Sequence, residues 1–210
     1  MSQRSSKGFT IIELLIATSV FSIILLVLAS GLIEIGRLYY KGVISSKTQE
    51  TARVIAEDIG RSIQFSGGQV SPLVTTGGIN SYCVGGRRYS FKLNVQTKDK
   101  PAIVHGLLVD NPTSDCVASI TGGPGVAQDF TTPLDKSEEL LGVNMRLSDL
   151  VISQVGTTNL YTVRVYVTYG DDDLLSDKML PAGLDTCNTG SGSQFCATSI
   201  LNTIVEKRIQ

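Results

Sequence analysis

The 20 residues from Leu14 to Ile33 contain no charged residue, and the apolar run is interrupted only by Thr18, Ser19, Ser22, Ser30 and Gly31. At a rise of about 1.5 Å per residue, a helix of this length is long enough to cross the hydrocarbon core of a bilayer. Glu13 stands at the edge of this stretch. The pattern therefore predicts a membrane-spanning helix with one carboxylate close to its start.

The helical pattern continues beyond the apolar stretch and becomes amphipathic. Apolar residues recur at three- and four-residue steps while most charged residues fall on the other side, as in a helix that seats one face on a core. The apolar positions are Ala52, Ile55, Ile59 and Ile63, and the charged ones are Arg53, Glu57, Asp58 and Arg61. We expect one helix from Phe9 to about Gln64, ended by Gly67-Gly68, with a hinge or a locally melted turn at Gly31 and Gly36.

The pattern changes to alternation of apolar and polar residues after position 68, which is typical of half-buried strands. The predicted strands cover residues 82–84, 89–95, 103–109, 145–155, 160–169 and about 197–209. Residues 145–155 and 160–169 form the predicted main hairpin, and Gly85-Gly86 is a predicted tight turn. A short helical turn is expected within 133–139.

Composition limits the function classes. The formal net charge is −1, which gives no electrostatic footprint for nucleic acid. The tight basic pair Arg87-Arg88 is interpreted as a solvated hairpin. About 175 residues remain beyond the apolar stretch, enough for one globular domain with its own core.

Four cysteines, Cys83, Cys116, Cys187 and Cys196, all lie beyond the apolar stretch. An even number in an extracytoplasmic domain indicates disulfides, and four cysteines allow three connectivities. Proximity in the sequence favours Cys187–Cys196, which leaves Cys83–Cys116. Zinc binding is disfavoured because the spacings contain no CxxC and the chain has a single histidine.

Catalytic motifs are missing from the sequence. It contains no G-x-S-x-G, no H-E-x-x-H, no phosphate-binding glycine loop and no dinucleotide fingerprint. The single histidine, His105, lies in a predicted strand, where a structural role is the simpler interpretation. We therefore expect a protein that is not an enzyme.

Glu13 raises an electrostatic question, because a carboxylate at bilayer depth costs roughly 2.5–3.5 kcal/mol. Nothing within the helix is expected to supply a partner. A cut between Gly8 and Phe9 would create an α-amine that could pair with Glu13 in the same or a neighbouring chain. As alternatives, Glu13 favours the positive end of its helix or lies at the membrane surface.

The run from Lys7 to Glu13, Lys-Gly-Phe-Thr-Ile-Ile-Glu after a polar leader, resembles the class III signal of type IV pilins and pseudopilins. The resemblance implies cleavage after Gly8 by a prepilin peptidase and N-methylation of Phe9. It also implies pairing of Glu13 with the terminal amine of an adjacent subunit. The implied fold is α+β and pilin-like, with a long N-terminal helix packed on an antiparallel β-sheet head and a disulfide-closed C-terminal region.

The resemblance also implies where the protein is located before and after assembly. The chain would be a single-pass protein of the cytoplasmic (inner) membrane with an extracytoplasmic head, later part of a pilus or pseudopilus at the cell envelope or surface. Its partners would be other pilin or pseudopilin subunits, prepilin peptidase, the inner-membrane assembly platform and lipid. The length and the late cysteine loop favour a minor subunit, and adhesion, motility, DNA uptake and secretion are alternative uses of such a filament.

No cofactor is expected, with calcium as the one alternative. The acidic residues Asp171, Asp172, Asp173 and Asp177 offer oxygen ligands, and some pseudopilins in the family bind calcium in such loops. The sequence has no EF-hand spacing, and a solvated acidic turn is the simpler interpretation.

The predicted organisation has four segments: a leader (1–8), the transmembrane and assembly half of the helix (9–33), its amphipathic half (34–66) and a β-rich head (67–210). Two alternatives stay open. One is an unprocessed single-span anchor for a binding or sensor domain. The other is a secreted hydrolase cut at Ala29-Ser30-Gly31, with a mature chain beginning near Leu32.

Overall fold

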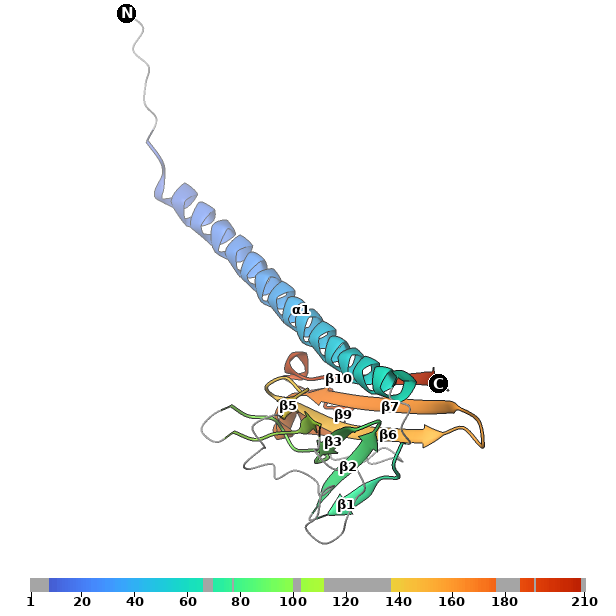
Figure 1. The fold of residues 1–210 in the computed structure, drawn as a ribbon. Coiled ribbons are helices and arrows are strands. Elements are labelled where there is room, and N and C mark those ends of the chain that lie inside the picture. The colour runs from blue at the N-terminus through green and yellow to red at the C-terminus, as the bar shows by residue number, and fades with distance from the viewer. Residues whose placement is uncertain are drawn as a thin grey trace, which may run out of the picture. The chain divides into compact units, whose positions relative to one another are not determined.

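A computed structural model describes residues 8–65, 70–76, 78–99, 103–111, 137–176, 186–190 and 192–208 of the chain (Figure 1). The chain divides into two compact units, Met1–Tyr40 and Lys41–Gln210. The helix α1, Ile11–Phe65, contributes to both units. The fold is α+β, with antiparallel sheets in the second unit, as the sequence predicts.

The first unit contains the apolar part of α1, and its helical structure continues through Gly31 and Gly36. The predicted hinge or melted turn at these glycines is therefore wrong. Glycine costs at most about 1 kcal/mol relative to alanine in a helix. Because helix propagation is cooperative, long runs of good helix formers on both sides offset that cost.

The described residues of the second unit form three sheets. The strand order is β1-β2-β3-β4-β5 in the first, β10-β7-β6 in the second and β8-β9 in the third, and all pairs are antiparallel. The first sheet has β1 (Val74–Thr76), β2 (Ile79–Val84), β3 (Arg87–Phe91), β4 (Leu107–Asp110) and β5 (Glu138–Glu139). The others have β6 (Met145–Gln154), β7 (Leu160–Tyr169), β8 (Leu175–Ser176), β9 (Thr186–Cys187) and β10 (Ala197–Glu206). Two 3₁₀ turns are η1 (Asp172–Leu174) and η2 (Ser193–Phe195).

Most predicted strands are found, with corrected ends. The main hairpin is β6–β7, and Gly85 and Gly86 form the predicted turn between β2 and β3 with φ of 56° and 89°. Positive φ at both positions is natural for glycine in a tight hairpin. The strand predicted at 103–109 begins only at Leu107.

The helical turn predicted within 133–139 is wrong where the structure describes it. Glu138 and Glu139 pair with β4 as the short strand β5, and residues 133–136 lie outside the described part. Glu139 also accepts backbone hydrogen bonds beside β4. This tertiary contact overrides the weak local preference for a turn.

The core of the second unit lies between α1 and the two larger sheets (Figure 1). The predicted apolar stripe of the helix is buried, as are alternate residues of β7. These buried positions are Ala52, Ile55, Ile59 and Ile63 of α1 and Tyr161, Val163, Val165 and Val167 of β7. Tyr89 of β3 reaches the helix, where its hydroxyl lies 2.9 Å from Asp58 and 2.8 Å from Ser62. Burial raises the pKa of Tyr89, so it keeps its proton for these bonds.

Arg88 and Asp110 form a buried ion pair across β3 and β4, with bonds of 2.9 Å and 2.5 Å to the two carboxylate oxygens. Both residues are only 5% exposed. Arg87 pairs with Asp58 of α1. The basic pair is therefore structural, and the prediction of a solvated hairpin is wrong.

This ion pair gives a stability prediction. We expect Arg88→Met alone to cost about 3–5 kcal/mol of unfolding free energy, because it leaves the Asp110 charge buried without its partner. The double variant Arg88→Met/Asp110→Leu is expected to recover much of that loss. Denaturant unfolding of the full chain in detergent, followed by tyrosine fluorescence, measures both. Equal losses in the single and double variants would contradict the prediction.

Candidate processing and assembly site

Gly8 and Phe9 precede the first residue of α1 and are exposed. A Cβ added at Gly8 would meet nothing within 4 Å. The described structure therefore gives no packing reason for glycine at this position. A requirement for glycine would have to come from a molecule that recognises the segment.

Thr10 and Glu13 cap the start of α1 reciprocally. The Glu13 carboxylate accepts hydrogen bonds of 3.0 Å from both the backbone N–H and the hydroxyl of Thr10. The backbone N–H of Glu13 donates to the Thr10 hydroxyl at 3.3 Å. This is the geometry of a capping box, in which a threonine and a glutamate three residues later satisfy free N–H groups of the helix.

We expected that nothing within the helix supplies Glu13 with a partner, and the partner that the structure shows, Thr10, lies one residue before α1. Thr10 supplies two hydrogen-bond donors, although it supplies no compensating charge. The sequence contained the signal, because a threonine followed three residues later by glutamate before an apolar run predicts this cap. Thr10 is therefore the residue of this site that the sequence analysis missed.

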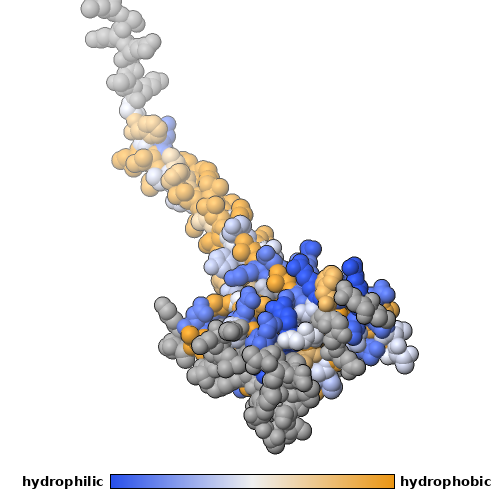
Figure 2. Space-filling model, viewed as in Figure 1, coloured by the Kyte–Doolittle hydropathy of each residue, from blue (hydrophilic) through white to orange (hydrophobic). Residues whose placement is uncertain are grey.

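The side chains of α1 from residue 14 to residue 33 are mostly apolar and all exposed, and Figure 2 shows the apolar surface on the face in view. Three hydroxyls of this region are satisfied within the helix, since Thr18, Ser22 and Ser30 each donate to a backbone carbonyl three or four residues earlier. Among the described residues, α1 is the one helix long and apolar enough to cross a membrane. A helix that is apolar all round requires lipid or other helices around it.

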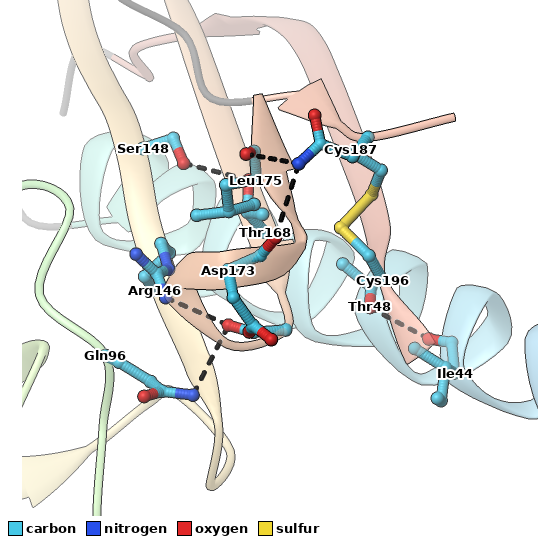
Figure 3. The surroundings of a disulfide bond; sticks show 12 residues. Ile44, Thr48, Gln96, Arg146, Ser148, Thr168, Asp173, Leu175, Cys187 and Cys196 are labelled. Carbon is cyan, nitrogen blue, oxygen red and sulfur yellow. Dashed lines mark hydrogen bonds between the residues drawn. A yellow bond between two sulfur atoms is a disulfide. The ribbon is translucent and has the colours of Figure 1, made fainter. Parts of the chain in front are cut away.

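The disulfide predicted between Cys187 and Cys196 is present and closes the segment between β9 and β10 (Figure 3). Cys83 on β2 is also disulfide-bonded. Its predicted partner, Cys116, lies outside the described residues. Cys196 directly precedes β10, so the disulfide holds the beginning of that strand.

The acidic turn after β7 is held by internal contacts (Figure 3). Gln96 donates to Asp171 at 2.7 Å, and the buried Arg146 donates to Asp172 at 2.7 Å. Within the described residues no group of three or more potential metal ligands is present, and Asp177 lies outside them. The side-chain carboxylates of two of the three described calcium candidates therefore already accept hydrogen bonds within the chain.

Glu139 is a half-buried carboxylate beside His105. It accepts bonds of 2.9–3.0 Å from the N–H groups of Gly106, Leu107 and Leu141, and lies 3.3 Å from His105 Nδ1. Burial raises the pKa of Glu139 above its ordinary value. The cluster joins β4, β5 and the start of the following loop, and it therefore has a structural part in the fold.

This raised pKa predicts a pH dependence of stability. The folded state holds the Glu139 proton more tightly than the unfolded state, so this contribution is complete below the ordinary pKa of 4.5. It is lost as pH rises through the raised pKa. We expect the stability of the parent relative to Glu139→Gln to fall with rising pH across this range, measured by urea unfolding. A constant difference would contradict the assignment.

Comparison with protein families gives one match, to the prokaryotic N-terminal methylation motif, over residues 3–29. Comparisons with curated proteins and with solved structures gave no match. The matched segment contains Gly8, Phe9, Thr10 and Glu13 and extends into the exposed apolar part of α1. The helix and the motif fit a membrane-anchored protein with a single span. The chain thus carries the prokaryotic N-terminal methylation motif at the start of a long apolar helix, as a type IV pilin-like protein does.

Proposed function

We propose that this chain is a non-enzymatic filament subunit, a minor pilin or minor pseudopilin of a type IV pilus or a type II secretion-like filament. The observation that carries the proposal is the methylation motif at residues 3–29, which heads the apolar helix. A prepilin peptidase cuts after Gly8, and Phe9 becomes the methylated N-terminus. The subunit waits in the inner membrane with its head outside the cytoplasm.

Assembly moves the apolar part of α1 from lipid into a bundle of equivalent helices. Both surroundings are apolar, so close packing of side chains and pairing of polar groups decide the preference. Glu13 then meets the α-amine of Phe9 from a neighbouring subunit at the assembly platform. Two opposite charges in a dry bundle compensate each other, whereas either one alone would be costly.

The second unit has its own buried core and a disulfide. This supports separate roles for the two parts of the chain: the apolar part of α1 makes the assembly contacts, and the head stays folded during assembly. No cofactor takes part in this mechanism, because helix packing and one charge pair supply what assembly needs.

Intact mass and N-terminal sequencing of the native protein test the proposal in one measurement. We expect a chain that begins at Phe9 and carries one additional methyl group on its amine. A native protein that retains residues 1–8 would instead identify an unprocessed anchor. A mature chain that begins near Leu32 would identify a secreted protein, and either result would overturn the proposal.

A further inference from the structure

The strand β10 forms one edge of the sheet β10-β7-β6 and runs beside the last turns of α1 (Figure 1). It pairs with β7 over ten consecutive residues without a register shift. β7 occupies one side of β10, and among the described residues no segment pairs with the other side of its backbone, which can therefore accept a further strand. Such an edge is a template for pairing with another chain.

The register fixes which backbone groups face that free side. The backbone N–H of Lys207 donates to the carbonyl of Asn159, and this pair continues the β10–β7 register just beyond the two strands. Because hydrogen-bonded pairs alternate along an antiparallel ladder, the odd-numbered residues of β10 bond to β7. In an antiparallel ladder the intervening residues direct both N–H and C=O away from that partner. Ile200, Asn202 and Ile204 therefore present these groups at the edge, and no hydrogen bond within the described chain engages them.

In the part of the chain that the structure describes, this edge lacks the features that usually prevent strand addition. Proteins protect edge strands with lysine, proline, bulges or a covering segment, and β10 contains no lysine, proline or bulge. The opposite edge, β6, is partly covered, since Asn94 and Thr97 donate to Leu147 and Met145. Two large apolar residues of β10, Ile200 and Ile204, are instead 53% and 67% exposed.

An open groove of about 870 Å³ lies between this edge and α1. One wall is β10 from Thr198 to Val205, and the other is a polar stripe of the helix. The stripe includes Arg53, Glu57 and Arg61, at intervals of about one helical turn. Glu57 contacts both arginines, at 2.6 Å and 4.0 Å, and both arginines are three-quarters exposed. The wall thus presents the charge order plus, minus, plus.

We propose that this groove binds an extended segment of another protein, which adds to β10 as a further strand. Main-chain bonds to Ile200, Asn202 and Ile204 would supply affinity, as in other β-strand additions. On the outer face of the sheet, apolar side chains of the segment would lie opposite Ile200 and Ile204. On the inner face, an acidic–basic–acidic series would complement Arg53, Glu57 and Arg61.

The spacing of the two walls is compatible with this charge pairing. Residues four apart on a helix rise about 6 Å. Alternate residues of an extended strand, which share one face, are about 6.6–6.8 Å apart. Three alternate charged residues of the segment therefore match three successive charged positions on the helix.

A fluorescent peptide of sequence Glu-Ile-Lys-Thr-Glu-Ile-Thr, with blocked ends, tests the proposal by anisotropy against the full chain in detergent. We expect saturable binding that weakens at least about tenfold when the two isoleucines of the peptide carry N-methyl groups, because their N–H groups bond to the edge. The charge-swapped peptide Lys-Ile-Glu-Thr-Lys-Ile-Thr should bind more weakly. The variant Arg53→Glu/Arg61→Glu should reverse this preference.

Asn202 provides a matched pair of variants. Its N–H faces the free edge, so Asn202→Pro removes an edge donor and no ladder bond to β7, whereas Asn202→Ala keeps the donor. We expect about a tenfold loss of peptide affinity in the first and little change in the second. The N-methylated peptide tests the same bond on the parent protein, so the proposal remains testable if Asn202→Pro fails to fold.

Equal binding of the methylated and unmethylated peptides, or no binding of either, would overturn the proposal. So would a dimer of the parent that Asn202→Pro abolishes without added peptide, because the edge would then belong to a second copy of this chain. Neither outcome depends on processing at Gly8. A negative result for the groove would therefore leave the proposed filament function standing, and a negative result for processing would leave the groove proposal standing.

Discussion

Replacing Gly8 with glutamate is expected to leave the chain uncut, so that the native protein accumulates with residues 1–8 attached. A peptidase that cuts between Gly8 and Phe9 must bring this backbone close to its catalytic groups. A charged side chain beside the cleaved bond obstructs that approach. Intact mass of the protein purified from its membrane measures the result.

A side chain at Gly8 is not expected to disturb the fold, since a Cβ at this position meets nothing within 4 Å. Gly8→Glu should therefore leave the unfolding of the second unit unchanged. Gly8→Ala is the matched control, because it adds only a methyl group and should be processed much more completely. Recovery of a chain that begins at Phe9 from Gly8→Glu would refute the assignment of the cleavage site.

Glu13→Ala is expected to reduce incorporation into filaments about tenfold or more while the head still folds. The loss follows because the α-amine of the neighbouring subunit would enter a dry helix bundle without a compensating charge, a cost of about 3–5 kcal/mol for a broken buried pair. Immunoblots of filaments sheared from cells, compared with the membrane fraction, measure incorporation. Undiminished incorporation would remove Glu13 from the mechanism.

The contact between Glu13 and Thr10 requires a second comparison, because alanine removes both a charge and a helix cap. Glu13→Gln retains the ability to accept hydrogen bonds from Thr10 but carries no charge. Thr10→Ala retains the charge and removes the side-chain half of the cap, at a cost of about 0.5–2 kcal/mol to the helix. If Glu13 pairs with an amine, the glutamine variant fails to assemble and Thr10→Ala assembles. The opposite result would make Glu13 a cap only.

The sequence was most informative where one local pattern decides the structure. The apolar run from Leu14 to Ile33 and the stripe of Ala52, Ile55, Ile59 and Ile63 predicted α1, and the alternation in 160–169 predicted the buried face of β7. These predictions succeed because helix and strand periodicity are properties of consecutive residues. The apolar run and the residues at its start also identified the motif that the family comparison finds at residues 3–29.

Two of the predictions that failed involve residues whose state depends on distant partners, and a third involves the cooperativity of a long helix. Arg88 looked like a solvated charge, but Asp110, 22 positions later, makes it a buried ion pair. Glu139 was predicted to lie in a helical turn, but pairing with β4 makes it part of the strand β5. A hinge was predicted at Gly31 and Gly36 from the low helix propensity of glycine alone. The cooperativity of the 55-residue helix, which offsets that cost, was left out of the prediction.

The sequence by itself determined the long helix, its apolar half and the motif at its start, and it favoured the pairing of Cys187 with Cys196, because each of these features depends on residues that are near one another in the chain. Only the tertiary structure decided that β10 lies at a sheet edge and that a charged stripe of α1 forms the other wall of its groove. The physical reason is that strand order and groove walls arise from contacts between residues far apart in the chain. Local periodicity carries no information about such contacts.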